Sequence, residues 1–302
     1  MSALGEVSEQ RLHAQGLDVA EVLRVVRTAL AEDLHLGPDL TTLATVSTTA
    51  HATGSVVPRA PGVLAGVGVA LAVLDCVLGV AGYQVTHAAQ DGHRAVPGQP
   101  VLTVTAPTAG LLTAERTMLN LLSHLSGVAT ATDAWVGAVA GTRCRIRDTR
   151  KTLPGLRQLQ KQAVRAGGGV NHRMALGDAA LIKDNHVLAA GSVVGALQLV
   201  RAAAPGVTCE VEVDSLTQLE QVLAEHPELV LLDNFTVADT ATAVTRRDAV
   251  SPQTGLESSG GLSLQVAADY ARTGVDYLAV GALTHSVHVL DLGFDLHGVD
   301  LD

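Results

Sequence analysis

Apolar and polar positions divide the chain into two regions with different periodicity. Residues 19–34 place an apolar side chain at every fourth position with charges between, which predicts an amphipathic helix. Residues 50–112 carry short Val, Thr and Leu runs separated by Pro and Gly turns, as β-strands do. An apolar helix around residues 66–81 interrupts them. The pattern predicts an amino-terminal region of mixed helix and strand.

From about residue 119 onward, strand-like segments alternate with helical ones. This alternation predicts parallel strands joined by helical crossovers, and hence an α/β barrel or an open α/β sheet. The predicted strands are residues 143–148, 180–183, 210–214, 229–233, 256–259 and 277–281.

Residues 63–82 are almost continuously apolar and approach the length of a membrane span. Asp75 lies in the middle, where a carboxylate is costly in a bilayer. We therefore expect a buried helix. Residues 1–10 lack the basic and apolar regions of a signal peptide, and the protein is expected to be cytoplasmic with no membrane partner.

Each predicted carboxy-terminal strand is followed by polar residues or glycine. In α/β barrels the active site lies at the carboxyl ends of the strands, so these groups are expected to converge. Helix capping is the alternative reading, and it suits Asp214-Ser215. The strand-end groups are Asp148 to Lys151, Lys183-Asp184, Glu212, Asp214, Asp233-Asn234, Ser259 to Gly261, and Gly281.

Positive charge is concentrated in one segment of an acidic protein. The formal net charge is −10, yet residues 143–173 contain nine Arg or Lys and a single Asp. Such clustering focuses a positive field, as a small polyanionic substrate requires. The acidic balance argues against a nucleic-acid partner. Arg157, Lys161 and Arg165 recur at i, i+4 and i+8, which predicts a solvated helix face with no catalytic role.

Metal and redox chemistry find little support in the sequence. The twelve histidines lack zinc-like spacing, and the three cysteines form no metal or disulfide pattern. Among the histidines, His172 is the functional candidate. No protein metal site is predicted. Magnesium held mainly by a pyrophosphate substrate and water fits better.

Several motifs recur in order over nearly the whole chain. They are Glu115 to Asn120, Asp148 to Gly155, Arg165 to Arg173 (RAGGGVNHR), Lys183 to His186, Glu210 to Val213, Leu232 to Asn234, Glu257 to Gly261, and Val280 to Ala282. Together they resemble quinolinate phosphoribosyltransferase, or nicotinate-nucleotide pyrophosphorylase (carboxylating), a type II phosphoribosyltransferase of NAD biosynthesis. Ser258 stands where the family is expected to have Ala.

The resemblance implies a two-domain fold. An amino-terminal α/β sandwich would comprise residues 1–118 together with the returning tail, residues 286–302. Residues 119–285 would form an incompletely closed α/β barrel.

The resemblance also implies the substrates, quinolinate and phosphoribosyl pyrophosphate (PRPP), and their sites. Around the quinolinate dicarboxylate it places Arg150, His172, Arg173 and Lys183, with Arg116 supplied by the other subunit of a homodimer. Lys151 would reach the pyrophosphate beside Thr149. Glu212 and Asp233 would lie near the ribose hydroxyls and Mg²⁺. The implied catalytic residues are Lys151, Lys183, Glu212 and Asp233.

Backbone N–H groups after the late strands are candidates for the 5-phosphate site, as late barrel strands commonly form phosphate sites. The candidates are Ser259, Gly260, Gly261, Gly281, Ala282 and Leu283. Gly167 to Gly169 could instead end a helix and let the chain approach the site.

The implied reaction transfers the 5-phosphoribosyl group to quinolinate and releases CO₂, giving nicotinate mononucleotide and pyrophosphate. Three alternatives remain open. The chain could be a related phosphoribosyltransferase for another acid, including one that serves a metal-uptake operon. It could be a Schiff-base aldolase that uses Lys183, or a non-catalytic metabolite sensor. A glycosidase with Glu212 and Asp233 as its carboxylate pair is disfavoured by the basic surroundings.

Overall fold

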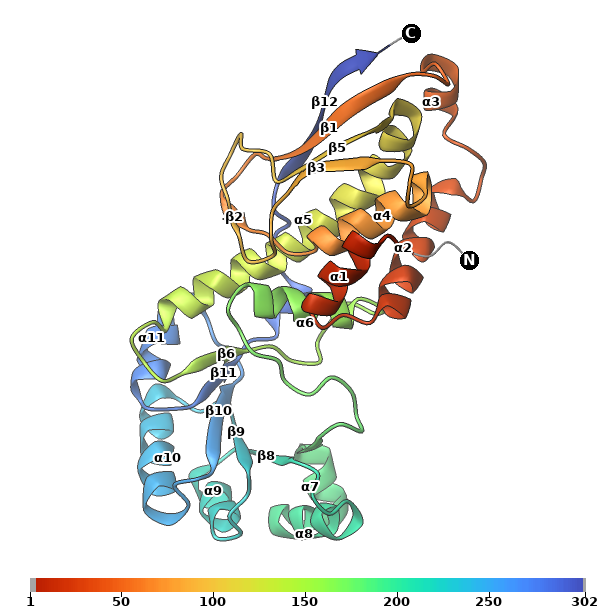
Figure 1. Cartoon of the computed structure of the whole chain (residues 1–302). Coiled ribbons are helices and arrows are strands. Elements are labelled where there is room, and N and C mark those ends of the chain that lie inside the picture. The colour runs from red at the N-terminus through yellow and green to blue at the C-terminus, as the bar shows by residue number, and fades with distance from the viewer. Residues whose placement is uncertain (1–3, 301–302) are drawn as a thin grey trace. The chain divides into compact units, whose positions relative to one another are not determined.

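A computed structural model describes residues 4–300 and divides the chain into two compact units (Figure 1). Of the described residues, unit 1 comprises those up to residue 131, residues 153–168 and those from residue 286 onward, and unit 2 comprises residues 132–152 and 169–285. Compared with the predicted domains, the division falls 13 residues later, and residues 153–168 join the amino-terminal unit.

Unit 1 contains a four-stranded antiparallel sheet in the order β12-β1-β5-β3. At the centre of this sheet Gly54 is required, because an added Cβ would overlap the ring of Phe294 on the neighbouring strand. A short ribbon of β2 and β4 accompanies the sheet. The strands are β1 (His51–Pro58), β2 (Gly62–Val63), β3 (Gln84–Ala88), β4 (Arg94–Ala95), β5 (Leu102–Pro107) and β12 (Leu292–Asp300).

Helices pack on one side of this sheet (Figure 1). The predicted amphipathic helix is confirmed as α2, with Asp18 capping its first turn by accepting a hydrogen bond from the Ala20 N–H. The long helix α5 begins in unit 1 and continues into unit 2. The helices are α1 (Glu6–Ala14), α2 (Val19–Leu34), α3 (Leu40–Thr45), α4 (Val67–Leu78), α5 (Thr108–Ala138) and α6 (Arg157–Ala166).

The predicted buried apolar helix is confirmed as α4. Asp75 in this helix is itself buried, and it accepts hydrogen bonds from the Gly5 N–H, the Ser8 hydroxyl and the Tyr83 hydroxyl. A buried carboxylate is tolerated when such donors surround it. Within residues 4–300 no single helix is long and apolar enough to span a membrane; only α7 (Asp184–Ala190) and α8 (Val193–Ala203) together, bent by 88°, satisfy the length and composition criteria.

One expectation about unit 1 was wrong. Lys161 on α6 is fully buried with the neighbouring Gln160, so α6 does not present all three of its basic residues to solvent. Arg165 is exposed and donates a hydrogen bond to the Gln15 carbonyl. The charge spacing alone could not reveal this, because it does not show which face of a helix packs against its neighbours.

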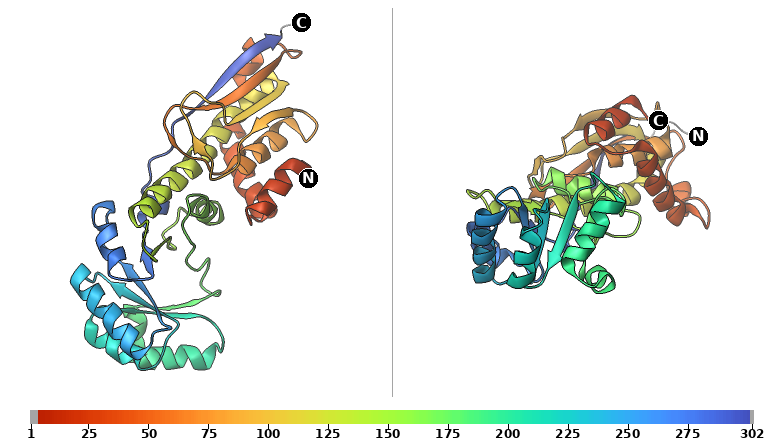
Figure 2. Two further views of the ribbon diagram at one scale, coloured as in Figure 1. Left: turned by 60° about the vertical axis from the view of Figure 1, so that its left-hand side comes forward. Right: turned by 90° about the horizontal axis from the view of Figure 1, so that it is seen from below.

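Unit 2 is a six-stranded parallel sheet in the order β6-β11-β10-β9-β8-β7, with helices packed along it (Figure 2). No ladder joins β6 to β7 among the described residues, so hydrogen bonds do not close the barrel. The mixed α/β class and the incompletely closed barrel are confirmed. The strands are β6 (Arg145–Arg147), β7 (Ala180–Ile182), β8 (Cys209–Val213), β9 (Leu229–Asp233), β10 (Gly255–Ser259) and β11 (Tyr277–Ala279).

Every strand of unit 2 was located from the sequence to within two residues at each end. Helices separate these strands and supply the crossovers that parallel pairing requires. They are α7 (Asp184–Ala190), α8 (Val193–Ala203), α9 (Leu216–Leu223), α10 (Val237–Val250), α11 (Leu264–Arg272) and α12 (Ala282–His285).

Candidate active site

The predicted residues of unit 2 lie at or just after the carboxyl ends of its strands, apart from His172 and Arg173 in the loop between α6 and β7. Because the strands are parallel and neighbouring, these ends share one edge of the sheet. We call the following residues the strand-end layer: Thr149 to Lys151, Lys183, Glu212, Asp233, Ser259 to Gly261, and Gly281 to Leu283.

Two arginines are held close together with donors unused. The Nε–H groups of Arg150 and Arg173 are buried without a hydrogen-bond partner among the described residues. Partial burial and the neighbouring Arg150 guanidinium lower the pKa of Arg173. Two adjacent guanidinium groups with free donors repel each other and favour an anion between them. Carboxylates are the natural partners, because the guanidinium fork binds them through two hydrogen bonds.

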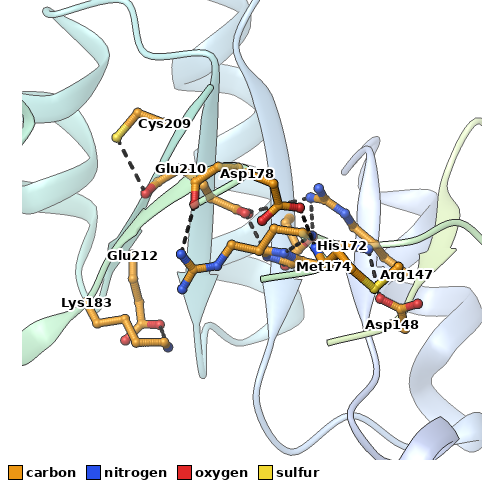
Figure 3. A network of polar contacts seen from close by, with 12 residues as sticks. Arg147, Asp148, His172, Met174, Asp178, Lys183, Cys209, Glu210 and Glu212 are labelled. Atoms are coloured by element: carbon orange, nitrogen blue, oxygen red, sulfur yellow. Dashed lines mark hydrogen bonds and ion pairs between the residues drawn. The ribbon is translucent and has the colours of Figure 1, made fainter. Parts of the chain in front are cut away.

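Lys183 and Glu212 form an ion pair across the ends of β7 and β8 (Figure 3). Lys183 is about half exposed and Glu212 is largely covered. The Lys183 backbone N–H also donates to the Nδ1 atom of His186, 3.0 Å away, which fixes the start of α7. A lysine paired in this way is a positioned cation rather than a free amine.

The ends of β6 and β11 lie against each other. The Thr284 hydroxyl donates to the Lys151 carbonyl over 2.8 Å, and the Lys151 N–H donates to the Thr149 hydroxyl over 3.0 Å. A Cβ added at Gly281 would lie 3.0 Å from the Lys151 side chain. The lysine stem therefore lies over the glycine turn, and Lys151 as a whole is exposed.

A glycine turn follows β10 beside the end of β9. The Asn234 N–H donates to the Ser259 carbonyl over 2.9 Å, and the Asn234 amide donates to Asp233 over 2.9 Å. Gly260 has φ +89°, and an added Cβ would overlap the Asn234 side chain. Only glycine fits this left-handed, close-packed position.

Arg116 lies on the part of α5 that belongs to unit 1, and its side chain is 66% exposed. The other predicted site residues all belong to unit 2. Gly167 is the C-cap residue of α6 and has left the helical conformation, and Gly168 has φ +88°, so this part of the Gly run ends the helix.

The predicted residue His172 belongs to a second group of charges, which lies further from the carboxyl ends of the strands than the Lys183–Glu212 pair (Figure 3). Its Nε2 atom is 2.8 Å from a Glu210 carboxylate oxygen and 3.9 Å from one of Glu257. Arg147 donates to Glu257 over 2.8 Å and lies 3.7 Å from Glu210. We call Arg147, His172, Glu210 and Glu257 the buried cluster.

Burial controls the electrostatics of this cluster. Desolvation and the Glu210 charge outweigh Arg147 and raise the pKa of Glu257 to about 7. Desolvation likewise raises the pKa of Glu210. Burial alone would lower the pKa of Arg147, but the carboxylates of Glu257 and Glu210 overcome this effect and raise it. The Arg147 guanidinium also stacks 5.0 Å from the Tyr277 ring centre.

The loop carrying His172 is fastened to the end of β6. The buried Asp148 accepts hydrogen bonds from the His172 N–H over 2.8 Å and from the Asn171 amide over 2.5 Å. Asp148 was grouped with the strand-end residues, but it acts here as an acceptor for the main chain of this loop.

The sequence analysis did not predict that Arg147, Glu210 and Glu257 lie together in one cluster. Their spacing from the strand-end residues could have revealed it. Each precedes a strand-end residue, Thr149, Glu212 or Ser259, by two positions, and alternate strand residues point to the same face. Charged side chains at such interior positions must pair with one another.

Three members of the cluster are close enough to hold a metal ion: His172, Glu210 and Glu257 have ligand atoms within 4.8 Å of one another. Arg147 already contacts both carboxylates and supplies the positive charge that an ion would bring. The donor set therefore fits an internal ion-pair network better than a metal site.

Comparison with known proteins agrees with this architecture. Residues 39–126 match the N-terminal domain of quinolinate phosphoribosyl transferase, and residues 128–295 match its C-terminal domain. The chain belongs to the quinolinate phosphoribosyltransferase family.

Individual members of the family are similar to this chain in both sequence and structure. The nicotinate-nucleotide pyrophosphorylase [carboxylating] of Mycobacterium leprae is 68% identical over 271 residues, covering 90% of this chain and 95% of that protein. The nicotinate-nucleotide pyrophosphorylase structure from Francisella tularensis superposes with a TM-score of 0.87 at 34% identity, covering 93% and 98% of the two chains. The crystal structure of NadC from Streptococcus pyogenes superposes with a TM-score of 0.87 at 37% identity, covering 94% of this chain and 98% of that chain.

Proposed function

We propose that this enzyme transfers the 5-phosphoribosyl group of PRPP to quinolinate and forms nicotinate mononucleotide, pyrophosphate and CO₂ in de novo NAD biosynthesis. The observation that carries the substrate assignment is the Arg150–Arg173 pair, whose buried Nε–H donors have no partner among the described residues. Quinolinate bears two adjacent carboxylates, and two neighbouring guanidinium groups match that charge pattern.

The chemistry requires positioning more than a protein nucleophile. The quinolinate ring nitrogen attacks C1 of PRPP, and the C1–oxygen bond breaks with its electron pair leaving on pyrophosphate. The ring nitrogen is then quaternary. The bond between C2 and its carboxylate breaks, CO₂ departs, and a proton replaces it at C2. Preorganised charges and substrate alignment supply the acceleration.

Each strand-end group has a role in this proposal. Arg150, Arg173 and Lys183 bind the dicarboxylate, with Lys183 held in place by Glu212. Glu212 and Asp233 face the ribose and stabilise the positive charge that develops at C1. The turns at Gly260-Gly261 and Gly281–Leu283 offer backbone N–H groups to the 5-phosphate.

On the pyrophosphate side, Lys151 and Thr149 lie together at the end of β6. Magnesium, held by pyrophosphate oxygens and water, would neutralise the leaving group. Glu212 and Asp233 end the neighbouring strands β8 and β9, where they could accept hydrogen bonds from the water around the ion rather than bind it directly. Lys151 adds a compact positive charge that suits an oxyanion.

The enzyme is proposed to act as a homodimer in which Arg116 completes the site of the other subunit. Arg116 is exposed and belongs to unit 1. Arg116→Ala and Lys183→Ala chains, each inactive alone, can be mixed. If sites are shared, each mixed dimer has one intact site, so random mixing restores about one quarter of wild-type activity. Self-contained sites would leave the mixture inactive.

The contact with Glu212 argues against the Schiff-base alternative, because the Lys183 nitrogen is engaged by a carboxylate, whereas the nucleophile of a Schiff-base enzyme must be free to attack a carbonyl carbon. Borohydride with a carbonyl substrate should therefore trap no adduct at Lys183.

The test of function is incubation with PRPP, Mg²⁺ and quinolinate labelled in its 2-carboxylate. Labelled CO₂ and nicotinate mononucleotide should appear in equal amounts, and none should form without PRPP. Ribosylation of nicotinate or another acid without CO₂ release would overturn the substrate assignment. Binding of quinolinate with no turnover would indicate a sensor.

A further inference from the structure

The His172 ring is held by the protein through both of its nitrogens. The Arg173 backbone N–H lies 2.6 Å from Nδ1, and a Glu210 oxygen lies 2.8 Å from Nε2. A backbone N–H can only donate, so Nδ1 must be the acceptor. The ring hydrogen is then on Nε2, where it donates to Glu210. This pattern fixes one neutral tautomer of His172.

The ring is also closed off from the strand-end layer. Only 8% of His172 is exposed, and its two polar ring atoms both face protein groups. A substrate carboxylate would have to displace Glu210 to reach Nε2, or the main chain of Arg173 to reach Nδ1. Figure 3 shows His172 among these groups and apart from the Lys183–Glu212 pair.

Glu210 and Glu257 are positioned in turn by Arg147. The Arg147 Nη1 atom contacts both carboxylates, at 2.8 Å for Glu257 and 3.7 Å for Glu210. Each glutamate keeps a second, buried oxygen that has no hydrogen-bond partner in the described part of the chain. Arg147 and His172 are thus the groups that orient this pair of carboxylates.

We infer that Arg147, Glu210 and Glu257 are positioning residues that hold His172 as the Nε2–H tautomer, so that its Nδ1 atom anchors the main chain at Arg173. Through this anchor the cluster presents the Arg173 guanidinium to quinolinate, and His172 does not contact the substrate. The inference rests on the proposed function, in which Arg173 binds a quinolinate carboxylate.

The contacts of Arg173 support the inference that the cluster positions its guanidinium. Its Nη1 atom donates to the Ala179 carbonyl over 2.9 Å, while its Nε–H stays buried without a partner among residues 4–300. The side chain is therefore fixed at one end by the protein and at its own backbone by His172. A small rotation at residue 173 would turn the guanidinium away from the Arg150 side chain.

The charges that face the cluster come from several elements. They are Arg147 on β6 and Asp148 directly after it, Arg173 in the loop before β7, Lys183 after β7, Glu210 and Glu212 on β8, Glu257 on β10, and the Tyr277 ring on β11. Two buried carboxylates against one guanidinium leave an excess negative charge, which a single proton shared between Glu210 and Glu257 would remove. A neutral His172 agrees with this balance.

The direct test reads the tautomer in the substrate-free wild-type enzyme. Nitrogen-15 NMR of labelled histidine, assigned to His172 with His172→Asn, should show an unprotonated Nδ1 and a protonated Nε2 between about pH 6 and pH 8. A proton on Nδ1, or a charged ring, would overturn the inference. The inference would also be overturned if adding quinolinate changed the Nε2 chemical shift by as much as direct binding of the ligand to that atom would.

The second test uses variants matched in chemistry. Glu210→Gln and Glu257→Gln should raise the KM for quinolinate roughly 10- to 100-fold, since small misplacement of a binding group is costly, and change the KM for PRPP less than about twofold. Glu220→Gln, a substitution on the exposed face of α9, is the control. Equal quinolinate KM values in all three variants would contradict the inference.

The two tests separate this inference from the proposed function. The tautomer is read without substrate and without turnover, so it stands even if the glutamine variants fail to fold. If wild-type enzyme releases no CO₂ from quinolinate, the proposed function fails, while the tautomer measurement still decides whether His172 is held as the Nε2–H form.

Discussion

The strand-end layer and the buried cluster contain similar residues but satisfy their charges differently. Arg150 in the strand-end layer and Arg173 beside it keep buried Nε–H donors that have no partner among the described residues, and Lys183 is half exposed. Two residues further down the strands, the buried carboxylates of Glu210 and Glu257 pair with Arg147, whose side chain is only 14% exposed. Charges left unpaired are available to a ligand, whereas charges paired with each other can only position their neighbours.

The largest effect should come from the strand-end layer. Arg150→Ala removes a bidentate donor and should lower kcat/KM for quinolinate roughly 100- to 1,000-fold. Arg150→Lys keeps the charge without the planar fork and should recover only part of this loss. Steady-state kinetics check both.

The matched control is Arg272→Ala, which removes an exposed arginine paired with Asp269 on α11. It should leave kcat/KM unchanged. If Arg150→Ala behaved like this control, the unpaired donors would have no part in binding, and the contrast between the two layers would fail.

A smaller effect is expected from Gly260→Ala. The substitution forces a Cβ onto Asn234 at a left-handed φ and should raise the KM for PRPP roughly tenfold, which corresponds to about 1.4 kcal/mol. Gly261→Ala is the control in the same turn. Its φ is +59°, but nothing lies within 4 Å of an added Cβ. Gly261→Ala should therefore introduce backbone strain without a steric clash and raise the KM for PRPP less than Gly260→Ala does. Equal effects of the two substitutions would show that the contact with Asn234 does not matter.

The last predicted effect concerns stability and its dependence on pH rather than activity. Glu257 has a pKa of about 7 in the folded protein against 4.5 in a free chain, so the folded state binds the proton more tightly. Its contribution therefore favours folding below about pH 4.5 and is lost as pH rises through about 7. Glu257→Gln should remove this loss of stability. The slope of the free energy of unfolding against pH should therefore become shallower by at most about 1.4 kcal/mol per pH unit.

Urea unfolding of wild type, Glu257→Gln and the exposed-site control Glu220→Gln over this pH range measures the difference. Identical slopes for wild type and Glu257→Gln would mean that Glu257 titrates normally and that the cluster carries no shared proton.

The sequence was informative about strands and their ends. Periodicity located the six parallel strands of unit 2, and the strand-end rule selected Lys183, Glu212 and Asp233. These features are local, since a strand and the residue after it are contiguous in the chain.

The buried cluster could not be found in the same way. Arg147, His172, Glu210 and Glu257 come from three strands and a loop, and only the sheet order brings them together. The burial of Lys161 was missed for a related reason, because helical spacing gives the face of a helix but not what packs against it. Arg116 shows the same limit, since its proposed role depends on a second chain.

The most direct test of the central claim is a crystal structure of the enzyme with quinolinate bound. We predict that the two carboxylates contact the guanidinium groups of Arg150 and Arg173, while the His172 ring nitrogens keep Glu210 and the Arg173 backbone as partners. A carboxylate bonded to the His172 ring, with Glu210 displaced, would contradict the division between a ligand-binding strand-end layer and a positioning cluster beneath it.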